Sequence, residues 1–255
     1  MNDFPRAVVS LGLGIALSGC AHLTTGQAGS PDDPLEPLNR AVFETNIALD
    51  DALIKPVAQA YRDIVPEFVR DRIRSAIDNL AEPRIFVNDL LQGRLDPAGI
   101  TLSRFFINTI AGIGGLFDRA TPQGFARQSG DFGQTLFAWG VADGPYVVLL
   151  LFGPSNVRDT VGLGVDLFTT PPALVVSGHA GRITNAVVGT LDGIDLRARN
   201  IETLEEIKKS ALDLYVHLKS ITRQRREAQL REARGEPEQP IELTDPGAPA
   251  SEPPR

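Results

Sequence analysis

The chain has very little of the chemistry that most enzymes use. Among its 255 residues there is one cysteine, Cys20, and there are three histidines. A single cysteine forms no intramolecular disulfide and no cysteine-based metal cluster. The sequence also lacks a G-x-S-x-G nucleophile elbow, a G-x-x-x-x-G-K-[ST] phosphate loop and a complete G-x-G-x-x-G dinucleotide fingerprint. We therefore expect no enzymatic activity, no cofactor and no metal, with a hydrolase built on an unflagged Ser or Asp as a distant alternative.

Basic charge and long apolar runs are scarce as well. Lys and Arg number 25 against 32 Asp and Glu, which gives a formal net charge of −7. Nucleic-acid-binding domains normally carry an excess of Lys and Arg, so we expect no nucleic-acid partner. The apolar run at the N-terminus, residues 7–17, is too short to span a bilayer, which takes about 20 residues.

The first twenty residues instead resemble a bacterial secretory signal with a lipoprotein cleavage site. Arg6 precedes the apolar run, and the tetrapeptide Leu-Ser-Gly-Cys at residues 17–20 follows it. This tetrapeptide resembles the lipobox, where the signal is cut before a cysteine that is then acylated. A chance cysteine in a cleaved signal, or a free thiol, is the plainer alternative. We expect Cys20 to be the lipid-attachment residue, and the absence of Asp at position 21 implies sorting to the outer membrane.

Composition divides the chain into four parts. Residues 1–19 are predicted to be the signal peptide, and residues 20–34 the lipidated cysteine and a flexible polar tether. Residues 35–232 alternate apolar stretches with turn signals and are predicted to form one helical domain. Residues 233–255 are rich in proline and acidic residues. Such a segment buries too little apolar surface to fold, so this tail is predicted to be disordered.

Apolar periodicity predicts helices throughout the body. One helix follows Pro66, is broken by Pro83 and gives way to a shorter helix that ends at Gly93. A further helix is predicted over residues 97–112, with Asp96 as its cap. Its apolar side chains point in nearly all directions around the axis, so it faces either the protein core or lipid, and the pattern alone favours the core.

Two other stretches have open interpretations. The apolar segment 146–152 is either a buried strand or a stretch that lies in one membrane leaflet. Near the C-terminus, an apolar stripe from Leu204 to Ile221 predicts one helix with a narrow packing face. The continuation, residues 219–234, carries six basic residues and two acidic ones. This run is either a solvated face or a surface attracted to anionic head groups or to an acidic partner.

Six motifs are spread over the body of the chain. They are DPLEPLNR (33–40), KPVAQAYRDIVP (55–66), NLAEPRIFVNDLLQG (79–93), RFFINTIAGIGGLFD (104–118), DFGQTLFAWGVADGPYVVLLLFGPSNVRD (131–159) and RQRRE (223–227). Together they resemble the MlaA/VacJ lipoproteins, and the similarity extends from residue 33 to residue 232. Two features depart from that family: Leu150 stands where relatives commonly carry proline, and the proline-rich tail lies outside the family pattern.

The resemblance implies an all-α fold. In that family a single ring-like helical domain lies embedded in the periplasmic leaflet of the outer membrane, beside a trimeric porin, with an amphipathic channel through its centre. The implied function is to remove mislocalised phospholipid from the outer leaflet and pass it to a soluble periplasmic lipid carrier. The alternative is a structural lipoprotein that tethers or scaffolds porins without moving lipid, which needs no polar path through the apolar body.

The resemblance also implies roles for individual residues. Helix 97–112 and segment 146–152 become candidates for lipid contact instead of core. The three glycines after the helix are candidates for a mobile loop at the channel mouth, or for a plain helix stop followed by a turn. The glycines are Gly112, Gly114 and Gly115, and the residues expected to face the membrane are Phe105, Phe106, Ile110, Val148, Leu149, Leu150 and Leu151.

Overall fold

The computed structural model describes residues 33–169 and 179–235, so Cys20 and the predicted signal lie outside the described residues, as does the tail from residue 236 on. The described chain is mostly helical and contains one two-stranded hairpin, which the all-α prediction missed. No helix in this part of the chain combines the length and the apolar character needed to cross a membrane. The elements are α2 (Glu36–Leu49), the π-helix η2 (Asp50–Ile54), α3 (Lys55–Ile64), α4 (Glu67–Leu91), α5 (Leu95–Ile110), the 3-10 helix η3 (Thr121–Gln123), α6 (Phe132–Ala138), β1 (Tyr146–Leu149), β2 (Gly153–Asn156), α7 (Val157–Thr169), α9 (His179–Arg199), α10 (Ile201–Ser210) and α11 (Leu214–Ala233).

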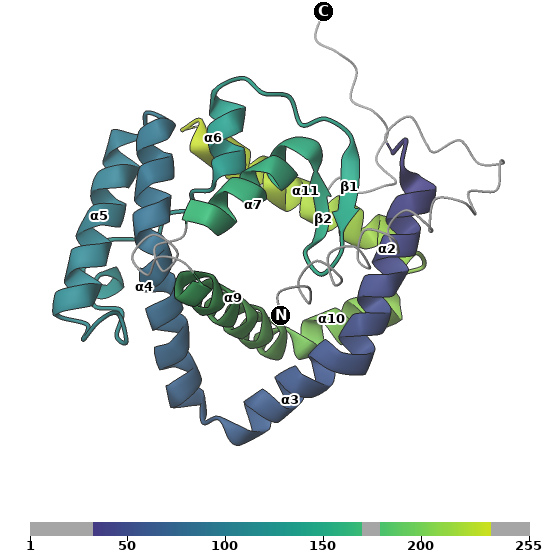
Figure 1. The fold of residues 1–255 in the computed structure, drawn as a ribbon, viewed down its shortest axis with the longest axis horizontal. Helices are drawn as coiled ribbons and strands as arrows, with labels where there is room; N and C mark the ends of the chain where they lie inside the picture. Colours follow the sequence, from purple (N-terminus) through teal and green to yellow (C-terminus); the bar gives the residue numbers. More distant parts are fainter. Residues whose placement is uncertain (1–32, 170–178, 236–255) are drawn as a thin grey trace, which may run out of the picture.

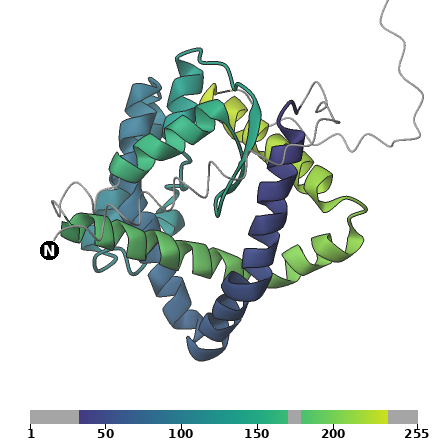
Figure 2. The same cartoon turned by 45° about the vertical axis from the view of Figure 1, so that its right-hand side comes forward.

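The helices follow one another around a closed ring (Figures 1 and 2). α2, α3 and α4 form a continuous arc, and α5 packs along the outer side of α4. α6, α7 and α11 close the opposite side of the ring, with the hairpin between them and α2. α9 packs against α3 and α4, and it leads through α10 into α11.

The apolar segment 146–152 forms β1 and the turn after it. β1 pairs antiparallel with β2, with Tyr146 opposite Asn156. The turn holds Leu151 at a φ of 68°, a conformation that few residues other than glycine adopt. Of the two predicted alternatives, a strand is therefore the right backbone structure, but only Val148 of this segment is fully buried.

Two asparagines on α2 hold the outer edge of β1. The side chain of Asn39 donates to the Tyr146 carbonyl at 3.1 Å and accepts from the Val148 N–H at 2.9 Å. Asn46, seven residues later on the same face of the helix, makes an equivalent pair of bonds further along the strand, at 2.9 and 2.8 Å. The backbone groups on this edge are thereby paired without a third strand.

The predicted helix break at Pro83 is wrong. α4 continues through this proline from Glu67 to Leu91, so the two predicted helices are one. An interior proline removes one backbone hydrogen bond and destabilises a helix. Here the side chains of Asn79 and Glu82, on the turn before the proline, both bond to α5. These tertiary contacts offset the local cost.

The C-terminal apolar stripe is not one helix either. α10 ends at Ser210, and α11 begins at Leu214. Asp213 caps α11, because its carboxylate accepts the Val216 N–H at 3.1 Å. The same carboxylate accepts a bond from Arg40 on α2 at 2.9 Å. The apolar spacing continues across the break, so periodicity alone does not reveal it.

The folded body begins slightly before the predicted boundary at residue 35. Asp33, which the sequence assigned to the tether, is fully buried. Its carboxylate accepts hydrogen bonds from the side chains of Asn39, Tyr215 and Lys219. The last residues of the predicted tether are therefore part of the fold.

Candidate functional site: an inverted surface and its polar interior

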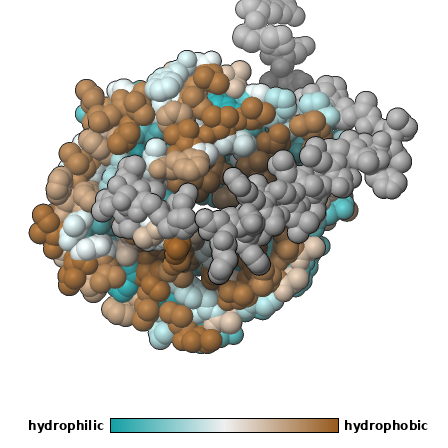
Figure 3. All heavy atoms as spheres, in the orientation of Figure 1, coloured by the Kyte–Doolittle hydropathy of each residue, from teal (hydrophilic) through white to brown (hydrophobic). Residues whose placement is uncertain are grey.

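The chain buries polar side chains and exposes apolar ones. Its buried apolar cluster is small and consists of Phe43, Val148 and Tyr215. Large apolar side chains are exposed on most helices, and Figure 3 shows them spread over the visible face. Water-soluble domains normally have the opposite distribution, so this surface fits an apolar surrounding. The largest fully buried side chains in the described chain are Arg104, Gln134, Glu82, Asn39, Thr101, Thr135, Asp33, Asp89 and Asp195.

α5 carries this inversion within one helix. The predicted helix 97–112 in fact begins and ends two residues earlier, at Leu95 and Ile110. Its outward positions are apolar: the side chain of Phe106 is 53% exposed and that of Ile110 is 78% exposed. Phe105 is half-buried and packs edge-to-face on Phe106. The buried stripe of the helix is Ala98, Thr101, Arg104 and Asn108.

Arg104 organises the buried stripe of α5. Its guanidinium donates to Glu82 at 2.8 Å and to Asp118 at 3.2 Å. Burial raises the pKa of Glu82. Burial also opposes the charge of Arg104, but the bonds to Glu82 and Asp118 outweigh it and raise the pKa of Arg104. The one charged residue of the apolar helix 97–112 therefore points into the protein, away from the apolar face.

The hairpin residues predicted to face the membrane fall into two groups. Leu150 and Leu151, in the turn, are 53% and 64% exposed. Leu149 is half-buried. Val148 is 6% exposed and packs in the core beside Tyr215, so it has no surface to offer lipid. The prediction that Val148 faces the membrane is therefore wrong.

The glycines after α5 form a compact turn. A Cβ atom on Gly112 would lie 2.3 Å from the Asn108 carbonyl oxygen, and one on Gly115 would lie 2.5 Å from the Asn79 Cβ. Gly114 and Gly115 have φ values of 69° and 90°. Close packing and left-handed backbone thus account for glycine here, in agreement with the helix-stop alternative. Movement of this turn at a channel mouth stays a prediction.

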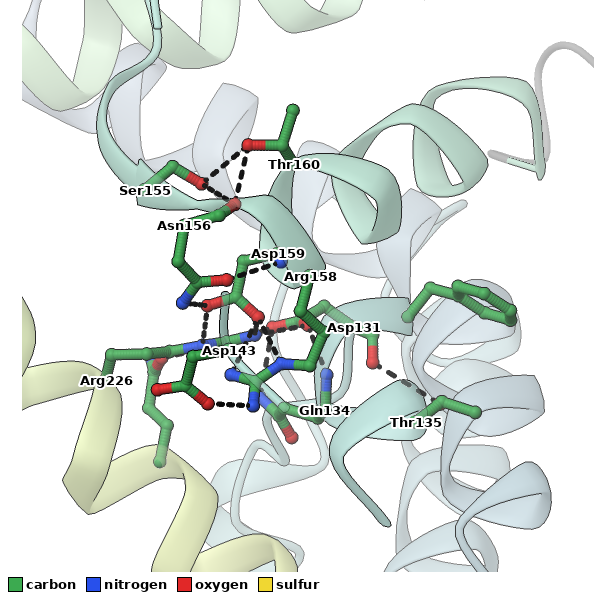
Figure 4. A network of polar contacts seen from close by, with 12 residues as sticks. Asp131, Gln134, Thr135, Asp143, Ser155, Asn156, Arg158, Asp159, Thr160 and Arg226 are labelled. Atoms are coloured by element: carbon green, nitrogen blue, oxygen red, sulfur yellow. Dashed lines mark hydrogen bonds and ion pairs between the residues drawn. The ribbon is translucent and has the colours of Figure 1, made fainter. Parts of the chain in front are cut away.

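A second polar centre lies where α11 meets α6 and α7 (Figure 4). Arg226 donates to both carboxylate oxygens of Asp131, at 2.7 and 2.9 Å, and to both oxygens of Asp159, each at 2.9 Å. Asp131 caps α6 by accepting the Gln134 N–H at 2.8 Å. At the start of α7, the Asn156 side chain accepts the Asp159 N–H at 2.8 Å and donates to the Asp159 carboxylate at 2.8 Å, so Asn156 caps this helix.

Electrostatics hold these two carboxylates ionised. Burial alone would raise the pKa of Asp131 and of Asp159. The hydrogen bonds and charge of Arg226 outweigh that effect and hold both pKa values below the ordinary 3.8. One arginine thereby ties the C-terminal helix to the starts of two others.

The basic run 219–234 consequently has two kinds of member. Arg226 and Lys219 are structural, since Lys219 pairs with buried Asp33 at 2.9 Å. Arg223 and Arg225 are exposed. The run is therefore neither wholly a solvated face nor wholly available to an external partner.

A cleft of about 480 Å³ lies beside this centre, between α11, α7 and the hairpin. That volume is in the range of pockets that hold small ligands or ligand head groups. No group of His, Cys, Asp and Glu in the described chain has an arrangement that would hold a metal ion. The charged residues that line the cleft are Arg84, Arg223, Arg225, Arg226, Asp131, Asp143, Asp159, Asp166 and Glu227.

Sequence reasoning missed the polar centre around Arg226, although part of its signal is local. Asp131 stands just before α6 as a capping residue, and Asn156 stands just before α7 as another. The close crossing of α6 and α7 also leaves its mark, because a Cβ on Gly162 would lie 2.3 Å from the backbone nitrogen of Gly133. The partners of Arg226, 95 and 67 residues away, have no local signature.

The chain matches the MlaA lipoprotein family over residues 31–229. It is 36% identical, over 85% of each chain, to the intermembrane phospholipid transport system lipoprotein MlaA of Shigella flexneri and to that of Escherichia coli K12. It is 32% identical to the Haemophilus influenzae protein of the same name, over 79% of this chain and 81% of that one.

A solved structure is also similar. It is reported under the words "Structural basis for maintenance of bacterial outer membrane lipid asymmetry" and superposes with a TM-score of 0.68 at 33% identity. The match covers 78% of this chain and 98% of that chain. Four of the six sequence motifs contain buried polar side chains, such as Asp33 in the first, and the last motif contains the partly buried Arg226. The chain belongs to the MlaA lipoprotein family.

Proposed function

We propose that this chain removes mislocalised phospholipid from the outer leaflet of the outer membrane and passes it to a soluble periplasmic carrier. The chain is a member of a family of outer-membrane lipoproteins that act in intermembrane phospholipid transport and maintain lipid asymmetry, and this family is not one of enzymes. The proposal adds three elements to that family assignment: removal of phospholipid from the outer leaflet, delivery to the soluble carrier, and a trimeric porin as neighbour.

The inverted distribution of side chains carries the proposal. A ring with an apolar outer surface is stable within the periplasmic leaflet, where exposed side chains such as Phe106 and Ile110 contact acyl chains instead of water. A phospholipid that crosses hydrocarbon unaided must desolvate its charged head group, at a cost of several kcal/mol or more. Polar groups on the inner side of a ring lower that barrier without any bond-making step. We therefore propose an amphipathic channel through the ring.

Lipid anchoring is the second part of the proposal. Cys20, outside the described residues, is the proposed acylation site and mature N-terminus. Mass spectrometry of the mature protein is expected to find acyl chains on Cys20, and an unmodified thiol there would contradict the assignment. The acidic tail 235–255 has no apolar pattern, so its removal is expected to leave lipid asymmetry intact.

The test is the phospholipid content of the outer leaflet in a deletion strain. The proposal predicts that phospholipid accumulates there and that the wild-type gene restores the normal leaflet. An unchanged outer leaflet would support the alternative, a structural lipoprotein that tethers or scaffolds porins without moving lipid. Porin abundance is measured in parallel, because a lost scaffold changes porin assembly first.

A further inference from the structure

We propose that the cleft between α11, α7 and the hairpin binds the head group of a phospholipid, and that it prefers a zwitterionic head group with a primary ammonium. This inference rests on the proposed transport of phospholipid, and it names a site for that substrate. The starting observation is that residues of both charge signs line one cleft of about 480 Å³. A phosphate next to an ammonium is complementary to such a lining.

Two arginines at the mouth of the cleft are available to the phosphate. Arg225 lines the cleft, is exposed and has no hydrogen-bond or ion-pair partner among the described residues. Arg223 meets Glu227 at 3.5 Å, and both side chains are more than half exposed, at 61% and 56%. Such an exposed pair contributes little and is easily exchanged. A guanidinium binds phosphate oxygens in a planar, bidentate fashion, which favours these arginines over a lysine.

Two carboxylates of the lining suit the ammonium. Glu227 is released when Arg223 turns to a phosphate, and Asp143, whose side chain is 60% exposed, uses one oxygen to bind Arg158. A primary ammonium donates N–H bonds to such oxygens. A quaternary ammonium has no N–H and is usually held by a cage of aromatic rings. Among the described residues that line this cleft, Tyr146 is the one aromatic residue.

The floor of the cleft is already fixed. Arg226 is held by four bonds to Asp131 and Asp159, so these three groups keep their places whether or not a ligand is present. A rigid floor with exchangeable charges at the mouth is a preorganised site. The selectivity of the site therefore resides in the residues at the mouth.

The first test is binding of short-chain lipid to the detergent-solubilised full chain, measured by titration calorimetry. Dihexanoyl phosphatidylethanolamine is the probe, and the phosphatidylglycerol and phosphatidylcholine analogues and inorganic phosphate are the comparisons. We expect the ethanolamine lipid to bind best. Equal binding of inorganic phosphate would mean an anion site and would overturn the assignment to a lipid head group.

The second test uses a matched pair of variants on α11. Arg225→Glu is expected to weaken binding by about tenfold, because it replaces a guanidinium that donates N–H bonds to the phosphate with a carboxylate, which is negatively charged like the phosphate. Arg231→Glu makes the same charge change on the same helix, outside the cleft, and is expected to alter binding by less than about twofold. If the charge reversal lowers the melting temperature, Arg225→Gln, which removes the positive charge without adding a negative one, replaces it in the test.

The third test concerns the carboxylates proposed to bind the ammonium. Glu227→Gln removes an exposed carboxylate and is expected to abolish the preference for ethanolamine over glycerol while the phosphate contact remains.

If wild type binds lipid but Arg225→Glu and Arg231→Glu bind it equally, the cleft is not the site and the transport proposal is untouched. If wild type neither binds nor moves phospholipid, the proposed function itself fails.

Discussion

Tyr146 and Tyr215 lie in edge contact, with their ring centroids 6.3 Å apart, yet their hydroxyl groups have different surroundings. Tyr215 donates to the buried carboxylate of Asp33. The buried hydroxyl of Tyr146 has no hydrogen-bond partner in the described chain. A buried polar atom without a partner costs roughly 1–3 kcal/mol, so the two hydroxyls are expected to have opposite effects on stability.

Replacing each tyrosine by phenylalanine tests this difference. Tyr146→Phe keeps the ring and is expected to leave the free energy of unfolding unchanged or to raise it. Tyr215→Phe removes a donor from a buried carboxylate and is expected to lower that free energy by about 1.5–3 kcal/mol. Denaturant unfolding of the two variants in the same detergent provides the measurement. Equal losses in both would show that the Tyr146 hydroxyl does have a partner.

Arg226 is the residue whose loss is expected to matter most among the basic residues of α11. Arg226→Met leaves the partly buried carboxylates of Asp131 and Asp159 without their shared cation. Removing one partner of a buried ion pair costs about 3–5 kcal/mol. Arg223→Met, on an exposed side chain of the same helix, is the matched control and is expected to cost less than about 1 kcal/mol. Thermal melts compare the two, and equal melting temperatures would contradict the structural role of Arg226.

The same contact predicts a pH dependence. The pKa values of Asp131 and Asp159 are lowered in the folded state, so their contribution is fully present above the ordinary value of 3.8 and is lost as the pH falls through the lowered values. In Arg226→Met, burial without the arginine raises both pKa values above 3.8, so the stability difference from wild type is expected to be constant near neutral pH, to begin to shrink above pH 4 and to go on shrinking through the lowered wild-type values. A difference that grows on acidification would contradict this assignment.

α5 is the element for which a membrane-embedded helix and a helix of a soluble domain make different predictions. Ile110 is 78% exposed, whereas Thr101 and Arg104 are buried on the other face. In a soluble protein an exposed isoleucine tolerates a charge. In hydrocarbon, an aspartate costs about 2.5–3.5 kcal/mol at the centre of a membrane helix.

Ile110→Asp is therefore expected to reduce the membrane-bound fraction of the chain without lowering its stability in detergent. Gln224→Asp introduces the same side chain at an exposed polar position of α11 and serves as the control. Flotation with vesicles measures the bound fraction of both variants. If they float equally, the outward face of α5 does not contact lipid.

The helices themselves were largely predictable, because apolar spacing and capping residues are local signals. Their boundaries were not, where distant contacts decide them. α4 continues past Pro83 because side chains on the preceding turn bond to α5. The C-terminal apolar stripe is divided at Asp213, which caps α11 and also accepts a bond from Arg40. Lipid contact by 97–112 was inferred only from family resemblance, since a helix that buries Arg104 and exposes Ile110 has the same composition as a core helix.

Polar contacts between distant parts of the chain close the ring as a whole. α11 is joined to α2 through Asp213 and Arg40, and to α6 and α7 through Arg226. α4 is joined to α9 by Arg74 and Asp192, at 2.7 Å. Hydrogen bonds and ion pairs strengthen when water is removed, whereas apolar contacts lose their driving force in lipid. This construction therefore suits a molecule surrounded by acyl chains.

Partitioning of the folded body without its anchor distinguishes most directly between a membrane-embedded ring and a soluble domain on a lipid tether. Cys20→Ala, exported by an ordinary cleavable signal, removes the proposed acylation site, which lies outside the described fold. Without acyl chains, the apolar surface of the ring has to supply the attachment by itself. We expect the unacylated protein to stay with the membrane fraction and to need detergent for extraction. Recovery of a folded, monodisperse monomer from the soluble periplasm would contradict the account.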